Sequence, residues 1–191
     1  MKFRIFTTAL ASLLCLPLTA LAQQAHDAWV SDRVVGSVTS YTRLTIFDDI
    51  SIEVTNGTVT LRGKVTMPFK RDDIGRRVEV LEGVQSVRNE IEVLPVSIQD
   101  DILRKKIARA IYGNPAFWRL AALPNPPIHI IVENGRVTLT GVVPTEVDRA
   151  LARSLATGQG EFSLVNALRT DAEVRAARFQ GSDSALERAR F

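Results

Sequence analysis

One stretch of this chain occurs twice. Residues 50–65 read ISIEVTNGTVTLRGKV and residues 128–143 read IHIIVENGRVTLTGVV, at a constant offset of 78 positions. An internal repeat constrains the architecture before any single residue is given a role. In both copies, apolar and polar residues alternate on either side of an Asn-Gly pair, which is the strongest short-range signal for a β-hairpin with a type I′ turn. The sequence therefore predicts two similar domains, each built on a hairpin with one buried and one solvated face.

The same order of elements surrounds both hairpins. In the first copy, apolar residues at three- and four-residue steps predict a helix over 32–44 after a polar lead-in at 23–32. A crossover helix over 70–81 and a third strand over 84–93 follow the hairpin. The second copy begins with a stronger helix over 98–112 and also continues into a crossover helix and a third strand.

This order predicts an α+β protein of two tandem αββαβ domains, each a three-stranded mixed sheet packed on two helices. The domains are expected at 30–95 and 97–171, followed by a C-terminal tail at 172–191 that is either disordered or a loosely attached helix. Asn89 and Asn166 recur among apolar positions of the third strands, where a hydrogen bond to nearby backbone is expected.

The first 22 residues have the pattern of a cleavable secretory signal peptide. Lys2 and Arg4 precede an apolar run, and Ala-Leu-Ala ends it before Gln23. A retained membrane anchor is the alternative, but the run is short for a bilayer span. Cys15 follows Leu14 instead of a small residue, so we expect it to leave with the leader and not to carry a lipid. The sequence therefore predicts a periplasmic chain.

Removing the leader removes two basic residues and the cysteine. The remaining 22 basic and 21 acidic side chains give a net charge of +1, so no overall basic field indicates a nucleic-acid partner. Without cysteine the mature chain forms no disulfide, and each domain depends on its own core.

The repeated motif resembles the BON domain, a bacterial module of αββαβ form. The run I-x-I/V-x-V-x-N-G-x-V-x-L-x-G-x-V is followed in both copies by a helix, a glycine and V/L-x-N-x-I/L. The second copy also contains I-Y-G-N-P-A-F and P-P-I-H-I-I-V between Ile111 and Val143. Two copies behind a signal peptide are similar to the two-domain periplasmic proteins and outer-membrane lipoproteins of this family. The resemblance implies a non-enzymatic module that binds phospholipid surfaces or envelope partners. It also implies a role in envelope or osmotic stress. The chain departs from the family at Arg169, where the last strand loses its apolar alternation.

The residues themselves offer little chemistry for catalysis, which needs a poised acid, base, nucleophile or metal. The mature chain has two histidines, His26 and His129, and no cluster of metal ligands at the usual spacing, so no metal or cofactor is predicted. His129 is expected on the outward face of its strand, solvated or packed against a neighbour. Asp-Asp pairs at 48–49, 72–73 and 100–101 lie near strand entries or helix starts, where capping accounts for them. We predict neither an enzyme nor a small-molecule substrate.

Cations and aromatic residues come together at one place in the second copy. They are Lys105, Lys106 and Arg109 on the predicted helix and Phe117, Trp118 and Arg119 in the loop after it. Cations for headgroups beside aromatic side chains are the pairing expected at an anionic phospholipid surface. The alternative is a solvated basic face with the aromatic rings covering their own core. The apolar side of the helix, which by this spacing includes Ile102, is expected on the sheet.

The outward face of the second hairpin is less polar than that of the first. Ile131 and Val142 stand where the first copy has Glu53 and Lys64. Such a face is expected to be covered by the other sheet, by the C-terminal segment or by a protein partner, and a short linker favours cover within the chain. A protein-interaction or chaperone-like protective module of the cell envelope, the alternative function, would depend on these two residues.

Overall fold

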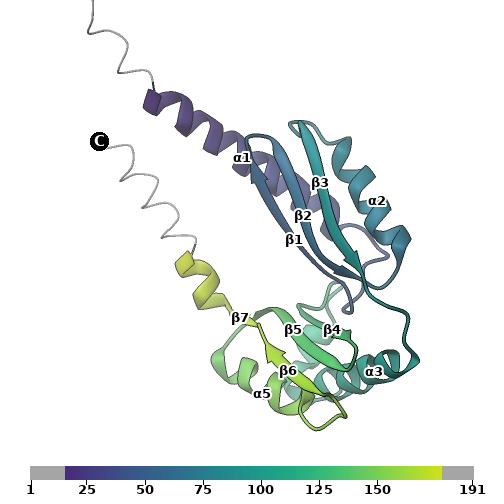
Figure 1. Ribbon diagram of the computed structural model, residues 1–191. Coiled ribbons are helices and arrows are strands. Elements are labelled where there is room, and N and C mark those ends of the chain that lie inside the picture. The colour runs from purple at the N-terminus through teal and green to yellow at the C-terminus, as the bar shows by residue number, and fades with distance from the viewer. Residues whose placement is uncertain (1–15, 178–191) are drawn as a thin grey trace, which may run out of the picture.

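The computed structural model describes residues 16–177, with side chains from residue 22. The expected leader lies partly outside the described residues, as do the last residues of the expected tail. Two sheets, each covered on one face by helices, lie one above the other in Figure 1. No helix in the described part of the chain is both long and apolar enough to cross a membrane.

The first domain has the predicted αββαβ order. Its elements are α1 (Leu16–Thr39), β1 (Asp49–Thr55), β2 (Thr58–Val65), α2 (Pro68–Glu79) and β3 (Ser86–Val93). β2 is the central strand, antiparallel to β1 and parallel to β3. Both helices contribute to one core, which includes Val30, Val34, Leu61, Ile74 and Val78.

The predicted bounds of the first helix are wrong at both ends. α1 runs through the expected polar lead-in at 23–32 and ends at Thr39 instead of Leu44. The early part is helical because Asp27 reaches the hairpin turn and Val30 is buried, so this segment has tertiary contacts that its polarity conceals. Tyr41 and Leu44 still pack on the core, but from turns after the helix.

The second domain repeats the plan with two modifications. Its elements are α3 (Ile98–Tyr112), η1 (Pro115–Phe117), α4 (Trp118–Ala121), β4 (Ile128–Glu133), β5 (Arg136–Val143), α5 (Glu146–Ala156), β6 (Ser163–Asn166) and β7 (Arg169–Thr170). The short helices η1 and α4 fill the irregular stretch before the hairpin. The third strand is split, because β6 and β7 both pair with β5 but are separated at 167–168. The split lies where the sequence loses its alternation.

The two Asn-Gly turns have the predicted left-handed backbone. φ is 50° at Asn56 and 71° at Gly57, and 51° at Asn134 and 73° at Gly135. Two successive residues with positive φ define the type I′ turn, which matches the twist of the strands it joins. The hairpins predicted from the repeat are therefore confirmed.

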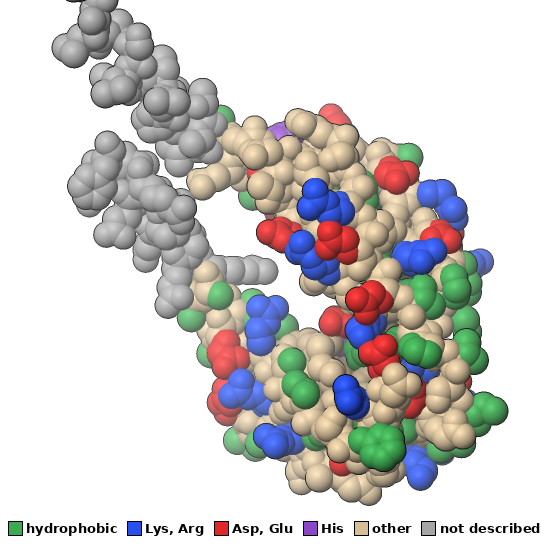
Figure 2. Space-filling view, viewed as in Figure 1, with side chains coloured by type: hydrophobic (Ala, Val, Ile, Leu, Met, Phe, Trp, Pro, Cys, Tyr) green, Lys and Arg blue, Asp and Glu red, His purple; other side chains and the backbone are tan. Residues whose placement is uncertain are grey.

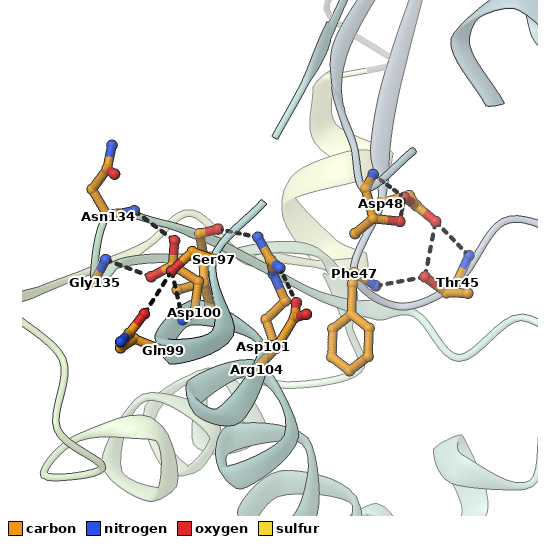
Figure 3. A network of polar contacts seen from close by, with 12 residues as sticks. Thr45, Phe47, Asp48, Ser97, Gln99, Asp100, Asp101, Arg104, Asn134 and Gly135 are labelled. Carbon is orange, nitrogen blue, oxygen red and sulfur yellow. Dashed lines mark hydrogen bonds and ion pairs between the residues drawn. The ribbon is translucent and has the colours of Figure 1, made fainter. Parts of the chain in front are cut away.

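An aspartate from the first helix of each domain holds the hairpin turn. The Asp27 carboxylate accepts hydrogen bonds from the amides of Asn56 and Gly57 at 2.7 and 2.9 Å. Asp100 does the same for Asn134 and Gly135 at 2.9 and 2.8 Å (Figure 3). The Asp100 amide also donates to the Ser97 hydroxyl, the cap of α3. The prediction that Asp100 serves only helix capping missed this contact with the turn.

The third strands are tied to the crossover helices by the asparagines. Asn89 donates to the Arg71 carbonyl at 2.9 Å, and Asn166 donates to the Arg149 carbonyl at 3.0 Å. These are the backbone hydrogen bonds expected for both asparagines. The repeat therefore extends to polar contacts as well as to the hairpins.

Candidate functional site

The outer side of α3 carries a mixed ridge of apolar and basic side chains. Its inner side is set by Leu103, Ile107 and Ile111, which are buried in the second core. With 3.6 residues per turn, the opposite side presents the residues between them. Ile98, Ile102, Lys105, Lys106 and Arg109 lie on that side and are exposed. The acidic Asp101 is exposed there as well, but it pairs with Arg104.

The side chain of Ile102 points away from the sheet, so the expectation that it lies on the buried side of the helix is wrong. Its side chain is 51 % exposed, and that of Ile98 is 73 % exposed, although both are large and apolar. The helix turns Ile102 outward because Leu103, one residue later, occupies the inward direction. The first two turns of the ridge therefore carry two apolar side chains beside Asp101, and the next two turns are basic.

The three cations on the ridge are not engaged in ion pairs within the described residues. Arg104, in contrast, is buried, pairs with Asp101 and donates to the Val132 carbonyl (Figure 3). One arginine of α3 therefore anchors the helix to β4, whereas Lys105, Lys106 and Arg109 remain available to solvent or a ligand. In Figure 2, hydrophobic and basic side chains mix along the lower right of the molecule, the side on which α3 lies in Figure 1.

Phe117 and Trp118 lie on opposite sides of the loop after α3. Phe117 is fully buried in the second core, so the expectation that it contacts a membrane is wrong. The 3-10 turn over η1, capped by the Asn114 side chain, directs Phe117 inward. Trp118 is 61 % exposed and its indole donates to the Gly113 carbonyl at 3.3 Å, at the end of α3. Arg119 is exposed beside it.

Tyr112 fixes the end of α3 on the sheet. Its hydroxyl donates to the Ile128 carbonyl at 2.6 Å and accepts from the Ile128 amide at 3.0 Å. Burial raises the pKa of Tyr112 to about 12, so the hydroxyl stays protonated. The ridge is therefore held at both ends, by Asp100 near its start and by Tyr112 at its close.

The outward face of the second hairpin is covered from within the chain. Ile131 is only 7 % exposed, and Val142 is half-buried. Asp49, Gly63 and Lys64 of the first domain and Ile131 line one cavity of about 380 Å³. The predicted cover within the chain is present, and Ile131 is not an open surface for a partner.

Polar contacts hold the first domain against β4. The Ile130 amide donates to the Ile46 carbonyl at 2.7 Å, and His129 Nδ1 lies 2.6 Å from the Asp48 carbonyl oxygen. Lys64 pairs with Glu133, whose carboxylate raises the pKa of Lys64. His129 is therefore packed against a neighbour, one of its two expected environments, and that neighbour is the other domain.

The described residues contain no group of three or more His, Cys, Asp or Glu side chains that could hold a metal ion. The features that stand out are instead surfaces: the α3 ridge and the exposed Trp118 beyond its end. These are binding features, with cations and apolar groups placed side by side.

Comparison with solved structures finds distant similarity to two structures of one bacterial protein. One is CdsD, a structural protein of the type III secretion system of Chlamydia trachomatis, at 11 % identity and a TM-score of 0.26, covering 76 % of this chain and 97 % of that one. Another is the C-terminal domain of CdsD, at 14 % identity and a TM-score of 0.24, covering 72 % and 96 % respectively. A comparison with curated proteins finds no match.

The family comparison is specific. The model of the BON domain matches twice, over residues 26–95 and 99–170, which are the two αββαβ units of the structure. BON domains are associated in general with binding to phospholipids and membranes. The chain belongs to the BON-domain family and carries two tandem copies of the domain.

Proposed function

We propose that the protein is a non-enzymatic periplasmic protein that binds anionic phospholipid surfaces through the α3 ridge of its second domain. The observation that carries the proposal is the exposure of Lys105, Lys106 and Arg109 without acidic partners in the described part of the chain. An anionic surface attracts each such cation by about 1 kcal/mol. The periplasmic location rests on the signal-peptide pattern alone.

Apolar groups flank the cations at both ends of the ridge. Ile98 and Ile102 are exposed at its start, and Trp118 is exposed beyond its end. An interfacial helix combines cations for headgroups with apolar or aromatic groups that enter the acyl boundary. The ridge supplies both kinds of group along one line, so the helix can lie parallel to the surface.

The matching helix of the first domain lacks this pattern. The residues equivalent to Lys105, Lys106 and Arg109, counted from the turn-holding aspartates, are Asp32, Arg33 and Gly36. Arg33 lies 3.9 Å from Glu82 and stacks over the Trp29 ring. We therefore assign surface binding to the second domain.

A protective module that shields envelope proteins is the alternative interpretation of the sequence. It would use Ile131 and Val142, and Ile131 is covered by the first domain. Of the two residues on which this role would depend, Ile131 is buried and Val142 is half-buried, so neither presents an open contact for a partner.

The test is sedimentation with vesicles of phosphatidylglycerol and phosphatidylcholine, or phosphatidylcholine alone, across a salt series. We expect association only with the anionic vesicles and weakening with salt, because ions screen exposed charges beyond about 8 Å at physiological ionic strength. Loss of two surface cations should weaken binding by about 2 kcal/mol, or roughly thirty-fold, and Lys105→Glu/Lys106→Glu should do at least this.

The matched control reverses two exposed cations elsewhere, Arg88→Glu/Arg153→Glu, with the same change in net charge. Equal losses in the two double variants would mean that overall charge, and not the ridge, governs association. Equal binding to the two vesicle types would refute the proposal outright.

A further inference from the structure

A groove opens beside the start of the α3 ridge, at the turn end of the second domain. Its volume is about 570 Å³, within the range of ligand pockets. Ile102, Leu103 and Phe162 supply large apolar side chains, and Lys106 is the one cation that the described residues contribute to the lining. Phe162 is 87 % exposed, which is unusual for so large an apolar side chain.

The first domain fills the equivalent space with its own side chain. Asp27 and Asp100 hold the two hairpin turns in the same way, so they are equivalent residues of the two copies. Aligning the copies on these aspartates places Trp29 at the position of Ile102. A Cβ placed on Gly83 would lie 2.7 Å from Trp29 Cζ3, so the indole rests directly against that loop. At Gly160, the matching glycine, the same point has no described atom within 4 Å. The groove exists because a smaller residue replaces the indole.

Two further differences from the first domain make the groove apolar and leave its one cation without an ion pair among the described residues. The main-chain amide of Gln85 donates to the Gly57 carbonyl, and that of Phe162 donates to the Gly135 carbonyl, both at 2.8 Å. Gln85 and Phe162 are therefore equivalent, and the phenyl ring of Phe162 replaces the polar side chain of Gln85. Arg33 of the first domain pairs with Glu82. In the second domain Lys106 and the residue equivalent to Glu82, the neutral Gln159, both line the groove. The cation of the groove thus lacks the acidic partner that its counterpart has.

The groove suits an alkyl chain better than a peptide. Its nearby main-chain donors, the amides of Asn134 and Gly135, are already bonded to Asp100 (Figure 3). The Asp100 carboxylate is only 2 % exposed and has both oxygens engaged. A peptide would therefore find no backbone ladder there, whereas an alkyl chain needs none.

We propose that this groove binds a single alkyl chain bearing an anionic head group, with the chain between Ile102 and Phe162 and the head group at Lys106. The chain replaces the contacts that the Trp29 indole makes in the first domain, and Lys106 takes the place of Arg33 above it. This inference goes beyond surface binding, because a monomeric amphiphile would suffice as ligand. The source of the chain is a free fatty acid or a phospholipid.

The test is calorimetric titration of the purified protein with monomeric laurate, below its micelle-forming concentration. Laurate should bind, and dodecyltrimethylammonium, with a similar chain and a cationic head, should not. Ile102→Trp should abolish laurate binding, because it restores the indole that fills the space in the first domain. The control variant Val96→Trp adds the same indole at a position that is 99 % exposed and outside the groove. This variant should bind laurate as tightly as the unchanged protein.

The outcomes separate this inference from the proposed function. Absence of laurate binding, or equal binding by Ile102→Trp with an unchanged circular dichroism spectrum, would overturn the groove whatever the vesicles show. Equal binding of both head groups would overturn the role of Lys106. Laurate binding that Ile102→Trp abolishes would support the groove even if anionic vesicles do not bind. In the vesicle assay, the distinguishing variant is Phe162→Gln, which restores the first-domain residue and lies off the ridge. Its weaker association would identify a phospholipid as the source, and unchanged association a free fatty acid.

Discussion

At the scale of single residues, the most deeply buried ion pair among the described residues is that of Asp48 and Lys70. Lys70 Nζ lies 2.6 Å from the Asp48 carboxylate, and the two side chains are 6 % and 1 % exposed. The amide and the hydroxyl group of Thr45, and those of Thr66, also donate hydrogen bonds to the Asp48 carboxylate (Figure 3 shows those from Thr45). The second domain has Pro126 and Asp148 at the equivalent positions, so only the first domain depends on this pair.

The pair makes the first domain sensitive to acid. Burial by itself would raise the pKa of Asp48, but hydrogen bonds from Lys70, Thr66 and Thr45 outweigh it and hold the pKa below its ordinary value of 3.8. A carboxyl with a lowered folded pKa contributes stability that is complete above its unfolded pKa and is lost as pH falls through the folded pKa. We therefore expect the free energy of unfolding to fall below about pH 4.

Asp48→Asn tests this, because it leaves the Lys70 ammonium buried without a counter-ion. We expect a loss of about 3 to 5 kcal/mol at pH 7 and a weaker dependence on pH below 4, measured by urea unfolding. Asp72→Asn, which removes an exposed partner of Arg71, should cost about 1 kcal/mol or less. Similar losses in the two variants would show that burial of the pair contributes nothing.

At the scale of elements, each first helix is fastened to its hairpin by one carboxylate. Asp100 is buried, whereas Asp27 is only half-buried, although both bond two turn amides. Water can replace a carboxylate at an exposed turn but not at a buried one. The same contact should therefore contribute more in the second domain.

We expect Asp100→Ala to lower the free energy of unfolding by about 2 kcal/mol or more, and Asp27→Ala by about 1 kcal/mol. Because both variants remove the same atoms, each serves as the matched control for the other in urea unfolding. A larger loss for Asp27→Ala would contradict the argument from burial.

Elements governed by local rules could be predicted from the sequence. The hairpins follow from Asn-Gly pairs that need positive φ, and α3 follows from its periodicity and its Ser97 cap. The start of α1 could not be predicted, since Asp27 and Val30 gain their partners only when the hairpin is in place. A helical prediction is least certain where tertiary contact, and not periodicity, stabilises the helix.

The sequence predicted the positions of the cations in the candidate site but not those of its apolar side chains. Lys105, Lys106 and Arg109 lie on the expected polar side of α3. Phe117 and Trp118 are neighbours in sequence but face opposite ways, because the 3-10 turn before Trp118 sets their directions. The groove at Ile102 was missed, although aligning the turn-holding aspartates of the two copies would have set Ile102 against Trp29.

At the scale of the whole molecule, the segment before β1 belongs to both domains. Ile46 and Phe47 precede the first sheet in the chain but pack against the core of the second domain. The Ile46 carbonyl also accepts the Ile130 amide, on the outer edge of β4. Removing the side chain of Phe47 should therefore weaken the second domain, although the residue lies in the first.

Phe47→Ala tests this coupling by hydrogen exchange. We expect the Ile130 amide to exchange faster, because its acceptor at Ile46 is no longer held in place, with a loss of roughly 1 to 3 kcal/mol in protection. Phe69→Ala is the control: that ring is 43 % exposed in the first domain and lies under Arg43. Unchanged exchange at Ile130 in Phe47→Ala would show that the domains are held by other contacts.

The seating of the first domain on the second has a geometric consequence at a surface. Hydrogen bonds from Ile130 and His129 and the ion pair of Lys64 with Glu133 join the domains at several points. If α3 lies along a bilayer, these contacts hold the first domain of every bound molecule at the same height above the bilayer and at the same tilt. Such a population would form a layer of uniform thickness whose outermost surface is always the same part of the first domain, so whatever meets the membrane there would first encounter that domain.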